Sequence, residues 1–209
     1  MFSFNNILIL ATVLVSIPAF GSSERMSKLV FNPYVVKLRN EWYRVITHGF
    51  IHVGWSHLLV NMFVLFFFGR NMEHILMTHF GEMGRVYFLM LYFGGMIFAT
   101  LPAFKKHSNN PNYNSVGASG AVSAVLFAHI LVLPTEMLYL YFAIPVPSVI
   151  FGIAYLWYEA WMDKKSADNI AHDAHFWGAI FGVAFMVAVD YNYFIQFFVQ
   201  ITQWISNLF

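Results

Sequence analysis

The stretch Gly117-Ala118-Ser119-Gly120 opens an apolar segment, Ser115 to Leu133, that the sequence predicts to be a membrane helix. A serine among small residues at the start of such a helix either permits close helix packing or acts as a nucleophile. Two other stretches bear on this choice. They are His57-Leu58-Leu59-Val60-Asn61 before it and Ala174-His175-Phe176-Trp177-Gly178 after it. Whether the three meet depends on how the chain crosses the membrane.

The composition is typical of a multi-pass membrane protein. Of the 209 residues, 59% are hydrophobic and only 10% are charged, whereas a soluble domain has about a quarter charged residues. The net charge of +1 gives no sign of nucleic-acid binding. The absence of cysteine excludes disulfides and thiol catalysis. Nine histidines are many for so apolar a chain, and polar groups inside a bilayer usually have a function.

The apolar runs predict an all-α membrane protein with six spans. A polar, then aromatic loop from Glu24 to Trp55 is expected to lie along the membrane interface before the second span. We expect the first run to be a retained helix and not a cleaved signal peptide, because no Lys or Arg precedes it. The spans cover approximately Ile7–Phe20, His57–Met77, Val86–Phe104, Ser115–Leu133, Ser148–Met162 and Ile170–Val189.

The last nineteen residues have a different character. Residues 191–209 repeat apolar side chains at helical spacing, with glutamines on the other face. We interpret them as an amphipathic tail helix at the membrane interface, a seventh span being the alternative. Residues 1–190 are then one membrane domain, and residues Asp163 to Asn169 a charged connection within it.

The order of the spans predicts that the three polar stretches lie at the same face of the membrane. Successive spans alternate in direction, so the second, fourth and sixth begin at the same face. His57 and Asn61, Ser119, and His175 therefore lie near one face at similar depth. Small side chains repeat every four residues in the fourth and sixth spans, which favours close contact between them. These are Gly120, Ala124 and Ala128, and Ala174, Gly178 and Gly182.

This placement fits nucleophilic acyl transfer. The Ser119 hydroxyl needs a base, and His175 is the nearest candidate. His57, the Asn61 amide and the Ser119 backbone N–H are candidate donors to an oxyanion. Taken singly, each residue more often has a structural role. Ser119 would help the helices pack, and His175 would form a hydrogen bond between helices. His57 and Asn61 would be a helix cap and its neighbour.

A histidine-rich metalloenzyme is a second interpretation. His48 and His52 are one helical turn apart, and His172 and His175 nearly so, which suits metal binding. No His-Glu-x-x-His motif is present, and few carboxylates lie near these positions in the sequence.

From Trp42 to Asp190 the chain resembles the rhomboid intramembrane serine proteases. Each shared motif is weak alone, but their order and their places in the second, fourth and sixth spans are specific. The matching positions are Arg44, His48 and His52; His57-x-x-x-Asn61; Gly69-x-x-x-Glu73; Gly117-x-Ser119-Gly120; and Ala174-His175-x-x-Gly178-x-x-x-Gly182.

The resemblance implies a six-helix bacterial-type core with a Ser119–His175 dyad without an acid. His57 and Asn61 would help the Ser119 amide bind the oxyanion, with Arg44, Glu73 and the motif glycines in supporting roles. The substrates would be single-span membrane proteins, cleaved in or near the bilayer of a bacterial inner membrane. The active site would open to the extracytoplasmic side, and no metal or other cofactor is expected.

Two positions depart from the family pattern. Tyr43 precedes Arg44 where the family usually has Trp, and Ser123 stands where an aromatic residue often packs on the catalytic imidazole. Phe176, Trp177 or some other ring would then orient His175. A catalytically inactive relative that binds membrane helices is therefore an alternative. The distribution of Lys and Arg also argues for the reverse membrane orientation, although the first loop is expected to be partly embedded.

Overall fold

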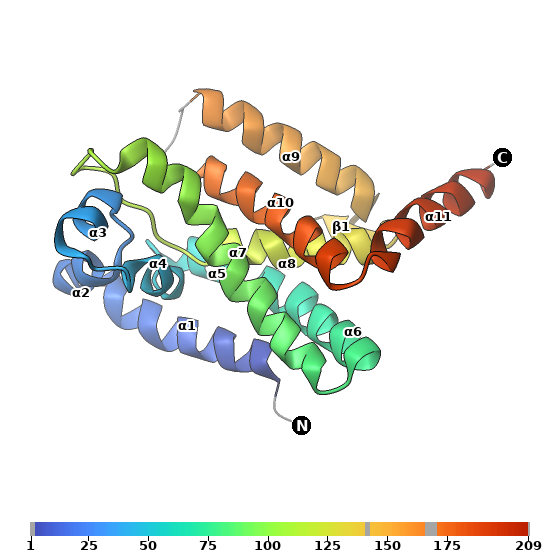
Figure 1. The fold of residues 1–209 in the computed structure, drawn as a ribbon, viewed down its shortest axis with the longest axis horizontal. Helices are drawn as coiled ribbons and strands as arrows, with labels where there is room; N and C mark the ends of the chain where they lie inside the picture. The colour runs from blue at the N-terminus through green and yellow to red at the C-terminus, as the bar shows by residue number, and fades with distance from the viewer. Residues whose placement is uncertain (1–2, 141–142, 166–170, 209) are drawn as a thin grey trace.

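The computed structural model describes residues 3–140, 143–165 and 171–208. The chain is a helical bundle in which α8 lies near the middle, with α7 and α10 packed against it (Figure 1). Its first half contains α1 (Phe4–Phe20), α2 (Ser23–Leu29), α3 (Pro33–Arg39), α4 (Arg44–Thr47), η1 (His48–Phe50), α5 (Trp55–Val64), the π-helical turn η2 (Leu65–Gly69), α6 (Arg70–Phe80) and α7 (Met83–His107). Its second half contains α8 (Ser119–Val132), β1 (Met137–Leu140), β2 (Ile144–Pro147), α9 (Ser148–Lys165), α10 (His172–Val189) and α11 (Asn192–Ser206).

Helix α8 is the centre of the bundle. All its residues from Gly120 to Leu131 are buried, as expected for a helix that is apolar on every side. It packs most extensively against α10 and α7. The predicted span from Ser115 was too long at its start, because the helix begins only at Ser119. The residues before it form a loop in which Gly117 has a φ of +114°.

Within residues 3–140, 143–165 and 171–208, two helices, α7 and α10, are long and apolar enough to cross a membrane. A third candidate is the pair Arg44–Phe50 and Trp55–Phe80, whose two parts meet at 96°. Helices α1 and α8 are apolar but shorter. The structure therefore supports a membrane protein with several apolar helices, and the count of six spans stays a prediction.

Helix α1 is fastened to the bundle at its N-terminus by Glu73. The Glu73 carboxylate accepts hydrogen bonds from Phe4 N at 2.7 Å, from Asn5 N at 3.1 Å and from the Ser3 hydroxyl. A carboxylate suits this position because the first N–H groups of a helix have no partner within the helix. Gly69, one turn before Glu73, approaches the Asn5 side chain closely. The Gly69-x-x-x-Glu73 motif thus holds α1 against α6.

A β-hairpin between α8 and α9 corrects the all-α prediction. Strands β1 and β2 are antiparallel, with Met137 opposite Pro147 and Leu140 opposite Ile144. Strand β2 contains Pro145 and Pro147. Proline cannot donate to a ladder but is tolerated in an edge strand, and both strands here are edges. The charged connection predicted at Asp163 to Asn169 lies partly outside the described residues.

The tail is helical, as predicted. In α11, Tyr193 is buried, and Gln200 Nε2 donates to the Val132 carbonyl at the end of α8, 3.0 Å away. Apolar side chains such as Phe198 and Leu208 remain exposed. Figure 1 shows α11 extending away from the bundle towards the C-terminus. Its place at a membrane interface, and the division of the chain at residue 190, stay predictions.

Candidate active site

The small-residue stripes bring α8 and α10 into backbone contact, as the sequence predicted. A Cβ on Gly178 would lie 2.2 Å from the Gly120 carbonyl oxygen, and one on Gly182 would lie 2.0 Å from the Ala124 carbonyl oxygen. Both distances are shorter than any tolerated contact. Glycine at these two positions therefore sets the distance between the helix that begins with Ser119 and the helix that carries His175.

Ser119 is the first residue of α8, and the loop before it is tied down by backbone bonds. Phe31 and Ser115 exchange two backbone hydrogen bonds, of 2.9 and 3.0 Å. Gly117 N donates to the His48 carbonyl at 2.9 Å, and Ala118 N donates to His52 Nε2 at 3.3 Å. The N-terminal N–H groups of α8 also have no helical partners. The serine hydroxyl is thus held at a helix N-terminus on a fixed loop.

His48 and His52 serve this loop and do not form a metal site together. His48 Nδ1 lies 3.0 Å from the Arg44 carbonyl oxygen. His52 uses both nitrogens: Nε2 accepts from Ala118 N, so Nδ1 carries the proton and donates to Ser16 Oγ at 2.9 Å. Ser16 in turn donates to the Phe50 carbonyl. These bonds leave no convergent pair of imidazole nitrogens for an ion.

His57 and Asn61 are next to the Ser119 loop. A Cβ on Gly117 would lie 2.6 Å from His57 Cε1, so the glycine makes room for the ring. His57 Nδ1 is buried and bonds to no group among the described residues. Asn61 Nδ2 donates to the His57 carbonyl at 2.9 Å, which leaves its second N–H free of that bond.

His175 is held by a carboxylate that we did not predict. Glu159 of α9 places Oε1 3.1 Å from His175 Nδ1 and Oε2 2.5 Å from His172 Nδ1. Among described rings, His175 contacts only His172, with centroids 6.1 Å apart, so neither Phe176 nor Trp177 stacks on it. One signal could have revealed Glu159: it is a lone acidic residue inside a predicted span, where an ionisable group usually has a function.

Ser119, His175 and both predicted oxyanion residues line one cavity of about 1220 Å³. Across the described part of the chain, no hydrogen bond joins Ser119 Oγ to the His175 ring. The cavity also contains Glu159, Ser123 and Tyr155. Ser123 Oγ lies 3.1 Å from the Tyr155 hydroxyl. An aromatic side chain from α9 therefore comes next to the position where we noted a missing aromatic residue.

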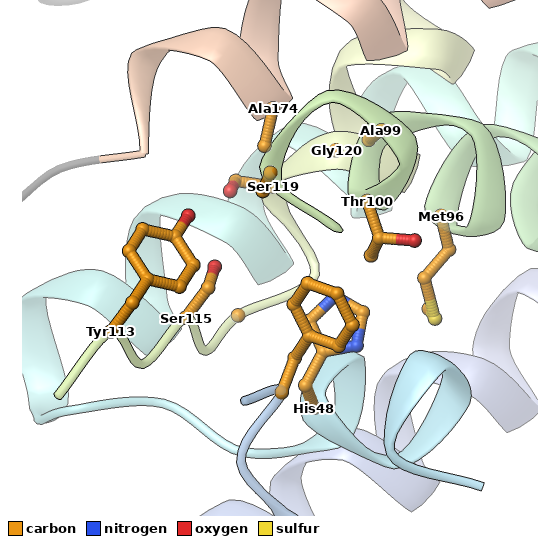
Figure 2. A pocket seen from close by; sticks show the side chains of 12 residues that line it. His48, Met96, Ala99, Thr100, Tyr113, Ser115, Ser119, Gly120 and Ala174 are labelled. Carbon is orange, nitrogen blue, oxygen red and sulfur yellow. The ribbon is translucent and has the colours of Figure 1, made fainter. Parts of the chain in front are cut away.

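A second, smaller pocket lies beside Ser119. Its volume of about 10 Å³ is close to that of a single water molecule. Figure 2 shows the Ser119 side chain next to Ala174, the residue before His175, with Ser115 and Tyr113 on another side. Ser119 thus lies between a space the size of one water and a cavity large enough for a peptide segment.

Arg44 fastens the interfacial loop. Its guanidinium donates to the Ser27 carbonyl at 2.7 Å, to the Val30 carbonyl at 2.9 Å and to Glu41 Oε2 at 2.6 Å. The hydrogen bond from Arg44 lowers the pKa of the Glu41 carboxyl. Arg44 also lies over the Tyr43 ring, 5.4 Å from its centroid. Arg44 therefore supports the loop, and it also lines the cavity that contains Ser119.

Comparison with known proteins agrees with the motifs. The family model described as the rhomboid domain matches residues 39–192. RHOMBOID-like protein 12, mitochondrial, of Arabidopsis thaliana is 30% identical over 168 residues, which are 73% of this chain and 49% of that protein. Rhomboid-related protein 1 of Caenorhabditis elegans is 27% identical over 168 residues, 76% of this chain and 43% of that protein.

The chain spans about half the length of these relatives or less. A plant mitochondrial protein and a worm protein give no support for a bacterial-type chain or a bacterial inner membrane. What the match over residues 39–192 does establish is that the chain belongs to the rhomboid family of multi-pass membrane proteins.

Proposed function

We propose that this chain is an intramembrane serine endopeptidase with Ser119 as nucleophile and His175 as general base. The observation that carries the proposal is that Ser119 and His175 line one cavity on two helices whose backbones touch at Gly120 and Gly178. Membership in a family that includes intramembrane serine proteases supports the same activity. Among the described residues the structure shows no hydrogen bond between these two side chains, and catalytic hydrogen bonds often tighten only in the complex with substrate.

The reaction proceeds in two halves. Ser119 Oγ attacks the scissile carbonyl carbon while His175 Nε2 takes the hydroxyl proton, and an oxyanion forms. His175 then gives this proton to the leaving amine nitrogen, the C–N bond breaks, and an acyl-serine remains. A water molecule attacks the acyl-serine, giving its proton to His175. Transfer of that proton to Ser119 Oγ releases the acid and restores the enzyme.

The oxyanion would be bound by donors that surround Ser119. The Ser119 backbone N–H is at the start of α8, where the positive end of the helix dipole adds to its effect. The free N–H of the Asn61 amide and the His57 ring line the same cavity. His57 lies beside Gly117, and Asn61 is bonded to the His57 carbonyl, which supports this role.

The substrates we propose are single-span membrane proteins. The cavity wall combines these polar groups with apolar side chains of α5, α8 and α9, among them Val60, Leu126 and Phe151. Such a wall suits an apolar peptide segment leaving the bilayer. A six-span core, a bacterial membrane and an active site opening to the extracytoplasmic side belong to the same proposal. Reporter fusions at the two ends of the chain would test the span count and orientation.

The test is cleavage of a generic single-span substrate by the full chain in liposomes. Wild type should cleave it, Ser119→Ala and His175→Ala should not, and a chelator should have no effect. A fluorophosphonate should label wild type but not Ser119→Ala. If wild type does not cleave, or if Ser119→Ala still does, the protease proposal is wrong.

Two other functions predict different results in the same assay. An inactive relative that binds membrane helices is the alternative suggested by Ser123 in place of an aromatic residue. It would bind the substrate without cleaving it. A metalloenzyme using His172 and His175 with Glu159 would lose its activity to the chelator.

A further inference from the structure

Glu159 has two carboxylate oxygens, and each faces a different imidazole. Oε1 lies 3.1 Å from His175 Nδ1, and Oε2 lies 2.5 Å from His172 Nδ1. We infer that Glu159 is a positioning residue for His175, and that His172 holds the carboxylate in place. This inference rests on the proposed function, in which His175 acts on Ser119.

The hydrogen bond fixes which nitrogen of His175 carries the proton. An ionised carboxylate can only accept, so the Nδ1 atom of each ring must be the donor. A neutral imidazole has one N–H, and His175 Nε2 therefore keeps a free lone pair. That is the tautomer that can take the Ser119 proton. Once His175 has taken it, the adjacent carboxylate stabilises the imidazolium.

The position of Glu159 supports this role on energetic grounds. The residue is 4% exposed and is part of α9, a helix rich in apolar side chains on the predicted fifth span. A buried carboxylate is costly unless it is paired and hydrogen-bonded. Here both partners belong to α10, and one of them is the proposed base. The hydrogen bonds between Glu159 and these two histidines also join α9 to α10 at the cavity wall.

The same three side chains are close enough to hold a metal ion, with ligand atoms within 4.8 Å of one another. The distances favour hydrogen bonds among these side chains over coordination of a metal ion. Ligand atoms of tetrahedral zinc, at about 2.0–2.2 Å from the ion, are about 3.3 Å apart. His172 Nδ1 and Glu159 Oε2 are only 2.5 Å apart, and each nitrogen faces its own oxygen. We therefore assign Glu159 to positioning, with a metal role as an outcome that the experiment can detect.

The experiment compares Glu159→Gln and Glu159→Asp with wild type, in liposomes, on the same single-span substrate. Loss of a comparable carboxylate from a Ser-His-Asp triad costs about 10⁴-fold in kcat. We expect Glu159→Gln to lower kcat by at least about tenfold with KM nearly unchanged. The rate of fluorophosphonate labelling of Ser119 should fall in proportion. Glu159→Asp, which keeps the charge, should recover part of both rates.

The matched control is Glu82→Gln, which makes the same change at a side chain that is 71% exposed; it should leave kcat unchanged. Thermal unfolding of each variant separates a positioning role from loss of the fold. If Glu159→Gln does not fold, His172→Gln carries the test, because it leaves Glu159 Oε2 without this imidazole. It should lower kcat less than loss of the carboxylate would.

The outcomes separate this inference from the proposed function. Wild-type kcat in a folded Glu159→Gln, with Ser119→Ala inactive, overturns the positioning role alone. A wild type without activity, or an active Ser119→Ala, overturns the proposed function and this inference with it. Activity that a chelator removes and zinc restores assigns the three side chains to a metal and overturns the positioning role.

Discussion

Gly178 of α10 faces the Gly120 carbonyl oxygen of α8 so closely that a Cβ on Gly178 would lie 2.2 Å from it. This contact, together with that of Gly182 on the Ala124 carbonyl oxygen, sets how near the His175 helix comes to the Ser119 helix. Backbone cannot move aside as a side chain can, so the two helices would have to separate to admit even a methyl group.

We expect Gly178→Ala to destabilise the protein by about 1–3 kcal/mol, as overpacking does in a close-packed core, and to abolish substrate cleavage. Thermal unfolding in detergent and the liposome assay measure the two effects. The matched control is Gly152→Ala in α9, where a Cβ would meet side-chain atoms only, of Ile130 at 3.2 and 3.4 Å and of Phe127 at 3.4 Å. Wild-type stability in Gly178→Ala would show that the helices can separate freely.

Gly117 should tolerate replacement by alanine as poorly as Gly178 does, but for a different reason. Its φ of +114° is in a region that favours glycine, and a Cβ would strike the His57 ring. Because loss of one oxyanion donor costs about 10²–10³-fold in kcat, we expect Gly117→Ala to lower kcat by at least about tenfold. Gly54→Ala is the control, since a Cβ there meets no atom within 4 Å. Unchanged kcat in Gly117→Ala would contradict the proposed role of His57.

Ser16 and His52 should be energetically coupled. His52 joins the Ser16 hydroxyl to the buried Ala118 N–H. Removing the ring leaves that N–H unpaired, which costs about 1–3 kcal/mol. A double-mutant cycle of Ser16→Ala and His52→Ala should give a coupling of about 0.5–3 kcal/mol in the free energy of unfolding. His74→Ala, at an exposed histidine, is the control. Additive effects would mean that α1 does not support the Ser119 loop through His52.

Glu73 should stabilise the start of α1. Glu73→Ala removes the acceptor for Phe4 N and Asn5 N, and loss of a helix cap costs about 0.5–2 kcal/mol. Faster hydrogen exchange in the first turn of α1 would measure the effect directly. Glu82→Ala, which changes an exposed carboxylate, should leave that exchange unchanged. Equal exchange rates in Glu73→Ala and wild type would show that packing alone holds α1.

The sequence alone indicated the helical membrane class, the three polar stretches and the small-residue stripes. These follow from local composition and spacing, which a single chain displays directly. Apolar runs of span length, a Gly and Ala repeat every four residues, and a helical stripe in the tail each predicted an element that the structure contains. The approach of α10 to α8 at Gly178 and Gly120 agrees with the stripes, because small residues let helix backbones come close.

Only the tertiary structure decided the local environment of each site residue. Nothing in the sequence places Glu159 against His175, which stands sixteen positions later in the chain. The same holds for Tyr155 beside Ser123, for Ser16 bonded to His52, and for the β-hairpin of β1 and β2. Composition and the spacing of apolar residues show which face of a helix is buried. The partners that a polar side chain finds there depend on how the helices pack, and that is a property of the whole fold.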